Sequence, residues 1–78
     1  MVEALDLREN PLITKFPLEI LKFKNLKWLN IDSKSISSIP NEIGQLKNLR
    51  KIYLHRDSLS VLEREKIKKL LPNCEIIF

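Results

Sequence analysis

Aliphatic side chains recur at a fixed spacing along much of this chain, and no other feature constrains its fold as strongly. At an offset of 23 in the numbering, five aliphatic positions in the central part have aliphatic partners: Leu26, Leu29, Ile31, Ile36 and Ile39 precede Leu49, Ile52, Leu54, Leu59 and Leu62. Toward the start the offset is 24, and the first four positions are preceded by Val2, Leu5, Leu7 and Leu12. This repeat predicts a solenoid, in which each turn of chain buries aliphatic side chains against its neighbours.

Each repeat combines a strand pattern with a helical pattern. Leu29 and Ile31 alternate with polar residues, and this period of two predicts a short strand with one buried face. After the pair Ile39-Pro40, aliphatic residues recur at every third position, which predicts a helical turn or a 3₁₀ stretch. A strand, a helical return and another strand form a right-handed coil with a parallel sheet on one side.

The repeats resemble those of a known family. Residues 2–12 fit the leucine-rich-repeat pattern L-x-x-L-x-L-x-x-N-x-L, with Asn10 at the asparagine position. Residues 39–49, IPNEIGQLKNL, are similar to the LPxEIgxLxxL segment of bacterial repeats of the type abundant in spirochaetes. The resemblance implies an α/β leucine-rich-repeat solenoid of about four parallel strands with helical or 3₁₀ returns. It also implies a non-catalytic scaffold that binds proteins, because most such repeat proteins act in that way.

The end of the chain departs from the repeat. Lys66 stands one repeat after Ile43, where the spacing requires an aliphatic side chain. Residues 60–63, SVLE, form a capping box and begin an amphipathic helix that Pro72 terminates. Its apolar face is expected to carry Ile67, Leu70 and Leu71, with Leu62 or Glu63 one turn above.

This helix and a fourth strand over about 74–77 form the expected C-terminal cap, which a solenoid needs to close its last turn. We therefore expect a single domain over residues 1–78, with repeats over about 2–25, 26–48 and 49–71 and a cap over about 60–78.

No equivalent cap precedes the first repeat. We therefore expect an unpaired first strand and an exposed apolar patch behind it, formed by Val2, Leu5, Leu7, Leu12 and Phe16. Longer N-terminal sequence in the natural protein or a second copy of the chain would cover such a patch. For the chain as given we expect a twofold homodimer joined through the N-terminal turn.

Few residues are available for catalysis or metal binding. The chain has one Cys, one His and one Gly, which excludes an internal disulfide, a Cys-based zinc cluster and a Gly-rich phosphate loop. His55 can be drawn into a triad with Ser33 and Asp32, but an exposed His on a binding face is the simpler interpretation. Cys74 occupies an aliphatic position of the repeat and is expected to fill the core. We expect no enzyme activity, metal or cofactor.

The outer face of the sheet, on the concave side of the coil, is the candidate interaction site. Side chains between the core positions point away from the core, and neighbouring strands lie about 4.8 Å apart, so stacked repeats form columns of contacting residues. One column holds Ala4, Trp28 and Lys51, and the next holds Asp6, Asn30 and Tyr53. The predicted partner-binding residues are Trp28, Tyr53, Arg56, His55, Lys51, Arg8, Asn30 and Asp32.

An exposed Trp beside a Tyr, with Arg and His around them, is typical of a binding hot spot. The alternative is that Trp28 packs locally beneath Lys51 as a cation–π pair. On the first interpretation the partner is a protein that remains unidentified.

Charge leaves further alternatives. The net charge is +4, and residues 47–69 hold eight Lys or Arg and three Asp or Glu. A solvated charged helix accounts for this surplus. Two alternatives remain open: the chain is a weak anionic-ligand binder, or it is a structural, self-associating solenoid. Nucleic acid is not expected as a partner.

The start of the chain lacks the basic and apolar regions of a signal peptide, and no run reaches the length of a membrane span. A cytoplasmic location is therefore expected, with secretion open if the chain is a fragment.

Overall fold

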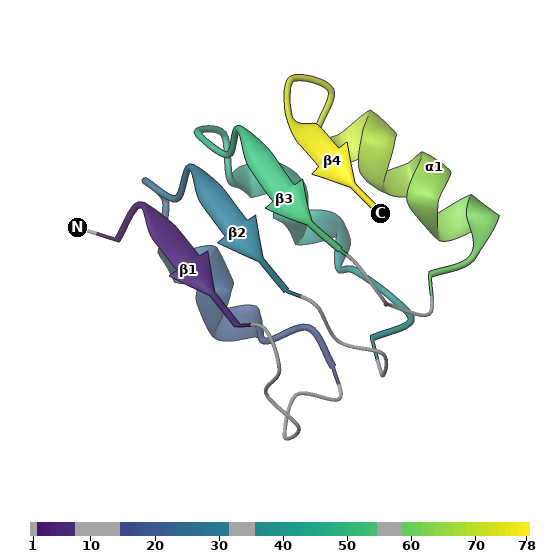
Figure 1. Ribbon diagram of the computed structural model, residues 1–78, viewed down its shortest axis with the longest axis horizontal. Coiled ribbons are helices and arrows are strands. Elements are labelled where there is room, and N and C mark those ends of the chain that lie inside the picture. Colours follow the sequence, from purple (N-terminus) through teal and green to yellow (C-terminus); the bar gives the residue numbers. More distant parts are fainter. Residues whose placement is uncertain (1, 8–14, 32–35, 55–58) are drawn as a thin grey trace.

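In the part of the chain that the structure describes, four short strands and three helical segments form two layers (Figure 1). The computed structural model describes residues 2–7, 15–31, 36–54 and 59–78. Its strands are β1 (Ala4–Asp6), β2 (Trp28–Asn30), β3 (Lys51–Tyr53) and β4 (Glu75–Ile77). They form one parallel sheet in the order β1-β2-β3-β4, as the repeat predicted.

The strand register matches both sequence offsets of the repeat. Leu5 pairs with Leu29 and Leu29 with Ile52, so the aliphatic positions form a row beneath the sheet. Leu29 and Ile52 are fully buried because a turn of chain lies on each side of them. The backbone ladder continues past the strand ends, with the Leu54 amide donating to the Ile77 carbonyl at 2.7 Å.

The first two returns are short 3₁₀ helices, η1 (Leu18–Lys22) and η2 (Asn41–Gln45). Each follows a proline, whose fixed φ suits a helix start and whose missing N–H removes a donor that would have no partner there. A 3₁₀ helix has three residues per turn, so the spacing of three places Ile20 and Ile43 on the inner side, where both are buried. The prediction of helical or 3₁₀ returns is confirmed, and η1 and η2 take the 3₁₀ form.

The third return is an α-helix, α1 (Val61–Leu70), which lies beside η2 (Figure 1). The Ser60 hydroxyl caps it by accepting from the Glu63 amide at 3.1 Å. Ile67 is fully buried, whereas Leu62 is 83% exposed. Leu62 is five residues before Ile67, on the other side of a helix with 3.6 residues per turn, whereas Glu63 is four residues before it and faces inward. Of the two residues expected above Ile67, Glu63 is therefore the one found there.

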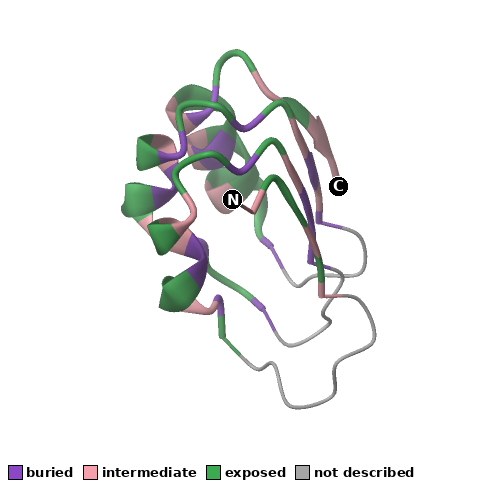
Figure 2. Ribbon diagram, turned by 90° about the vertical axis from the view of Figure 1, so that its left-hand side faces the viewer, coloured by how far each residue is buried: buried purple, intermediate pink, exposed green. Residues whose placement is uncertain are grey.

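The core lies between the helical layer and the sheet (Figure 2). Phe16 is buried in it, so the expectation that Phe16 adds to an exposed N-terminal patch is wrong. Val2, Leu5 and Leu7 are half-buried and pack against this core, and Leu12 lies outside the described residues. The fully buried core side chains are Leu26, Leu29, Ile31, Ile36, Ile39, Ile43, Leu46, Ile52, Leu54 and Ile67.

Candidate interaction face

The outer sheet face carries two of the predicted residue columns. Trp28 lies beside Lys51, and Asn30 lies beside Tyr53, on adjacent strands. The structure therefore brings together four of the eight predicted partner-binding residues. The other four, Arg8, Asp32, His55 and Arg56, lie outside the described residues.

Trp28 and Tyr53 form an aromatic pair at the centre of this face. Their ring centroids are 5.7 Å apart and the ring planes meet at 66°, an edge-to-face contact. Both residues are half-buried, so the pair offers apolar surface and ring edges to solvent. The diagonal contact predicted from the columns is present.

Lys51 also contacts Tyr53. Its ammonium group lies 5.0 Å from the centre of the Tyr53 ring and 3.8 Å from a Glu75 carboxylate oxygen. Hydrogen bonding to the Tyr53 side chain, with a smaller contribution from the Glu75 charge, raises the pKa of Lys51. The cation–π contact that Lys51 makes is thus with Tyr53, whereas the alternative interpretation placed it over Trp28.

Asn30 differs from the prediction because it is 6% exposed, although it points to the outer side of the sheet. Its Oδ1 atom is buried and accepts no hydrogen bond. A buried amide oxygen without a donor costs about 1–3 kcal/mol. Strand alternation gives the direction of a side chain, but its burial depends on the bulk of its neighbours, and here Asn30 lies beside Tyr53 on β3.

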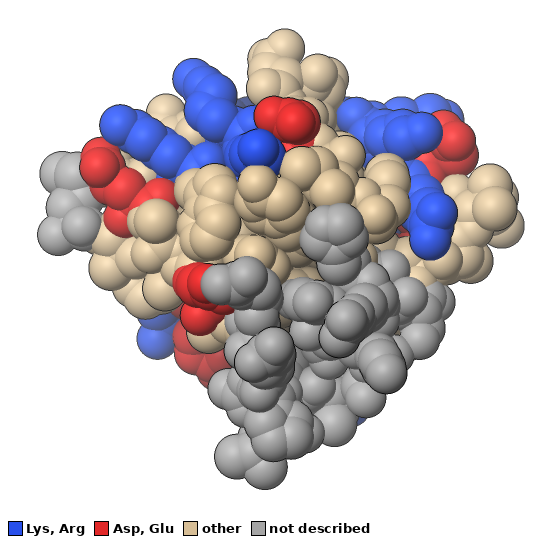
Figure 3. Space-filling view, viewed as in Figure 1, with Lys and Arg blue, Asp and Glu red and all other residues tan. Residues whose placement is uncertain are grey.

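Charged side chains surround this face (Figure 3). Its centre is uncharged, and basic side chains gather along the edge where the strands begin, with acidic atoms among them and on the β1 side. At that edge Lys27 pairs with Glu3 at 3.2 Å, and both side chains are more than half exposed.

Three of the four basic side chains of α1, Arg64, Lys66 and Lys68, have local partners. Lys66 pairs with Glu63 at 2.9 Å and Lys68 with Glu65 at 3.7 Å. Arg64 and Lys68 also lie over the Phe78 ring, at 5.1 and 5.9 Å from its centre. These contacts fit the interpretation of a solvated helix surface better than that of an anion site.

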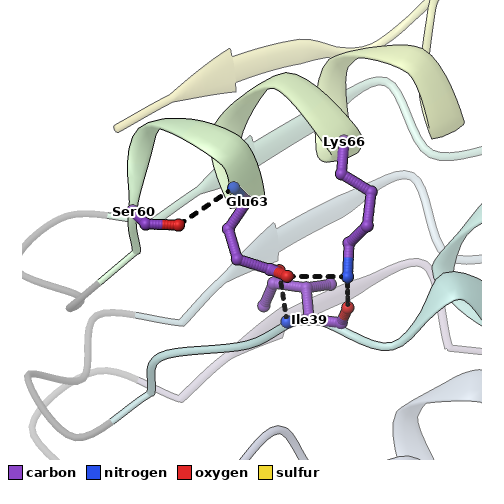
Figure 4. Close-up of polar contacts among 4 residues, drawn as sticks. All are labelled: Ile39, Ser60, Glu63 and Lys66. Atoms are coloured by element: carbon purple, nitrogen blue, oxygen red, sulfur yellow. Dashed lines mark hydrogen bonds and ion pairs between the residues drawn. The ribbon is translucent and has the colours of Figure 1, made fainter.

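Glu63 and Lys66 together clamp one residue of the preceding repeat (Figure 4). The Glu63 carboxylate accepts from the Ile39 amide at 3.2 Å, and the Lys66 ammonium group donates to the Ile39 carbonyl at 2.8 Å. Lys66, and to a lesser degree the Ile39 amide, lowers the pKa of Glu63. Sequence reasoning missed this contact, although Lys66 at an aliphatic position of the repeat was its signal.

The described residues offer little for chemistry. They contain no group of three or more His, Cys, Asp or Glu side chains that could hold a metal ion. Cys74 is half-buried, and burial raises the pKa of its thiol to about 11, which disfavours the reactive thiolate. Within the described part of the chain, no helix has the length and apolar character needed to cross a membrane.

Comparison with solved structures supports the fold. No protein-family profile matches the chain. A leucine-rich-repeat protein of Leptospira interrogans has a solved structure that is 37% identical, with a TM-score of 0.63, over 85% of this chain and 23% of that one. The uridine 5'-monophosphate transferase of Xanthomonas campestris pv. campestris is 40% identical over 50 residues, which are 64% of this chain and 9% of that protein. The chain thus spans less than a quarter of either protein.

The parallel sheet, the 3₁₀ returns and the Leptospira structure define a leucine-rich-repeat solenoid. The chain is a leucine-rich-repeat protein of the spirochaete type found in bacteria. This likeness suggests a protein-interaction module, and the fold is one typical of proteins without enzyme activity.

Proposed function

We propose that this chain binds a protein partner through the outer sheet face, centred on Trp28 and Tyr53. The observation that carries the proposal is the edge-to-face pair, which stands half-exposed in the middle of the sheet. Aromatic side chains contribute large contact areas at low entropic cost and dominate many interfaces. Predicted neighbours outside the described residues, Arg56 and His55 among them, are part of the proposal.

The strands hold the pair in place before a partner arrives. Trp28 and Tyr53 belong to the two central strands, each paired on both sides. A preorganised site loses less entropy on binding than a loop that must first become ordered. This support favours the sheet face over exposed apolar residues elsewhere, such as Leu62 on α1.

The test compares variants that differ in where they remove apolar surface. Trp28→Ala and Tyr53→Ala are each expected to weaken binding by about 2 kcal/mol or more, which is roughly thirtyfold in Kd. Leu62→Ala serves as the matched control, because Leu62 is exposed on α1. A partner captured by the wild-type chain is purified and its Kd measured by calorimetry, with circular dichroism to check the fold. Equal affinity for wild type and both aromatic variants would contradict the proposed face.

Self-association is a second candidate, favoured by one observation. Val2, Leu5 and Leu7 are half-buried, whereas Leu29 and Ile52 in the same row as Leu5 are fully buried. A second copy packed against the N-terminal turn would complete that burial.

The Xanthomonas protein transfers uridine 5'-monophosphate, according to its name. The matched 50 residues are 9% of its length. For this chain we therefore propose recognition of a partner and no transfer reaction.

A further inference from the structure

Among the residues that the structure describes, the outer sheet face contains one buried side-chain atom without a hydrogen-bond partner. Asn30 Oδ1 receives no hydrogen bond, although the residue belongs to a central strand of the proposed binding face. A buried acceptor of this kind calls for an explanation, and a donor supplied by a bound partner is one. The atom is an acceptor, so the missing group is a hydrogen-bond donor.

A negative charge lies directly beside this acceptor. Asp6 is the register partner of Asn30 on β1, about 4.8 Å away across the sheet, and it is exposed. A carboxylate has about four acceptor positions, so it can take a further donor whatever else it contacts. Two acceptors on adjacent strands therefore face the same region of the surface.

The aromatic pair adds an electron-rich surface to these acceptors. Trp28 lies two residues before Asn30 on the same strand face, and Tyr53 lies beside Asn30 on β3. The Tyr53 ring already attracts one cation of the chain, the Lys51 ammonium group at 5.0 Å. Trp28 is half-exposed, and an indole ring is the best aromatic partner for a cation.

From these neighbours we infer that the outer sheet face binds an arginine side chain of a protein partner between Asp6 and Asn30, against the Trp28 ring. This inference rests on the proposed function and names the partner chemistry of the same site. A guanidinium group carries five N–H donors in one plane, so it can reach two acceptors on neighbouring strands and stack on a ring at once. Asp6 lies beside Asn30 on the edge strand β1 and is exposed, so rotation of its side chain can open the Asn30 carbonyl to the donor while Trp28 and Tyr53 stay in place.

The test uses a peptide that contains the side chain and nothing else of the partner. Acetyl-Gly-Arg-Gly-amide is titrated into the full chain and followed by NMR, through the indole signal of Trp28, the single Trp, and the side-chain amide signals of Asn30. The control peptide replaces Arg by citrulline, which has nearly the same shape but no charge. We expect binding about tenfold stronger for the arginine peptide, at a Kd of about 1 mM.

Two variants and one control locate the contact. Asp6→Asn and Asn30→Leu should each weaken arginine binding by about tenfold, whereas Glu42→Gln, an exposed carboxylate on η2, should leave it unchanged. Asn30→Leu should also melt at the same or a higher temperature than wild type, because it removes the unpaired carbonyl. A purely structural Asn30 would instead lower the melting temperature and leave arginine binding intact, which would overturn the inference.

The outcome separates this inference from the proposed function. If the arginine and citrulline peptides bind alike, or neither shifts the Trp28 signal, the arginine inference fails. A loss of partner binding in Trp28→Ala would then still support the outer sheet face. If partner binding is unaffected by Trp28→Ala, the proposed function fails instead.

Discussion

Leu54 shows how much of the stability of a small solenoid depends on one side chain. It directly follows β3 and is fully buried. Leu54→Ala is expected to cost about 2–5 kcal/mol through lost contacts and the cavity left behind, against a total stability of about 5 kcal/mol. Urea unfolding followed by circular dichroism measures it. Leu62→Ala, at an exposed position, should stay within about 0.5 kcal/mol of wild type, and a similarly small effect of Leu54→Ala would contradict the observed packing.

Cys74 should be protected from alkylation by the fold. With a pKa of about 11, its thiolate is roughly a hundredfold less populated at pH 8 than that of an unfolded-chain Cys. Iodoacetamide should therefore modify the folded chain far more slowly than the urea-unfolded chain, as mass spectrometry can measure. The raised pKa has no effect on stability at neutral pH, where the thiol is protonated in both states, and lowers stability only as alkaline pH ionises the unfolded chain. Equal alkylation rates would show that Cys74 is not protected.

Single residues mark the limit of what the sequence predicts. The spacing of the repeat correctly placed Trp28 beside Lys51 and Asn30 beside Tyr53. It could not predict that Asn30 would be covered, because the burial of a side chain on the outer face depends on the sizes and rotamers of its neighbours. Lys66 was interpreted as a solvated side chain, since its partner is a backbone carbonyl 27 residues away in the sequence.

Among the elements, strands and 3₁₀ returns followed from the sequence because each has a distinct spacing, two for strands and three for returns. The α1 helix was predicted from its capping box, but its sequence favoured neither Leu62 nor Glu63 as the inward-facing residue. Leu62 stands one repeat after the buried Ile39, but it lies in a helix with 3.6 residues per turn, whereas Ile39 precedes a 3₁₀ return with three. Leu62 is therefore exposed, and Glu63 faces inward in its place.

The clamp between α1 and Ile39 should make stability depend on pH. Glu63 is 22% exposed at its side chain, and its lowered pKa means that the folded state favours the carboxylate. Its contribution is therefore present above the unfolded carboxyl pKa of about 4.3 and is lost as the pH falls through the lower folded value. Glu63→Gln should be less stable than wild type by about 1 kcal/mol at pH 7, typical of a partly exposed hydrogen-bonded ion pair.

Urea unfolding at pH 7 and at pH 3 checks this expectation, and the difference between Glu63→Gln and wild type should shrink at the lower pH. Glu65→Gln is the control on the same helix, because Glu65 is 58% exposed and pairs only with Lys68 at 3.7 Å among the contacts described. A constant difference at both pH values would mean that the Glu63 charge does not stabilise the clamp.

At the scale of the whole molecule, burial is lower at the two ends of the sheet than in its middle: Leu5 on β1 and Ile76 on β4 are half-buried, whereas Leu29 and Ile52 between them are fully buried. Val2, Leu5 and Leu7 are half-buried, and self-association through them remains a proposal. Analytical ultracentrifugation at micromolar concentration should show a dimer for wild type and a monomer for Leu5→Lys, because a charged side chain in that interface is unpaired. Leu18→Lys is the control, since Leu18 is 61% exposed on η1. A wild type that sediments as a monomer would contradict the proposed dimer.

The contacts between elements run from each turn to the next, from β1 to β2, β2 to β3 and β3 to β4. Apolar residues are half-buried at both ends of this stack, but α1 adds hydrogen bonds from Glu63 and Lys66 to Ile39, and no such pair of contacts is found among the described residues around β1. In such a one-dimensional stack, opening starts at the least supported turn and moves inward. Amide hydrogen exchange should therefore form a gradient, fastest at Leu7, slower at Ile31 and slowest at Leu54, although all three amides donate to the neighbouring strand segment. Local unfolding would then begin at β1 and proceed toward β3 and α1.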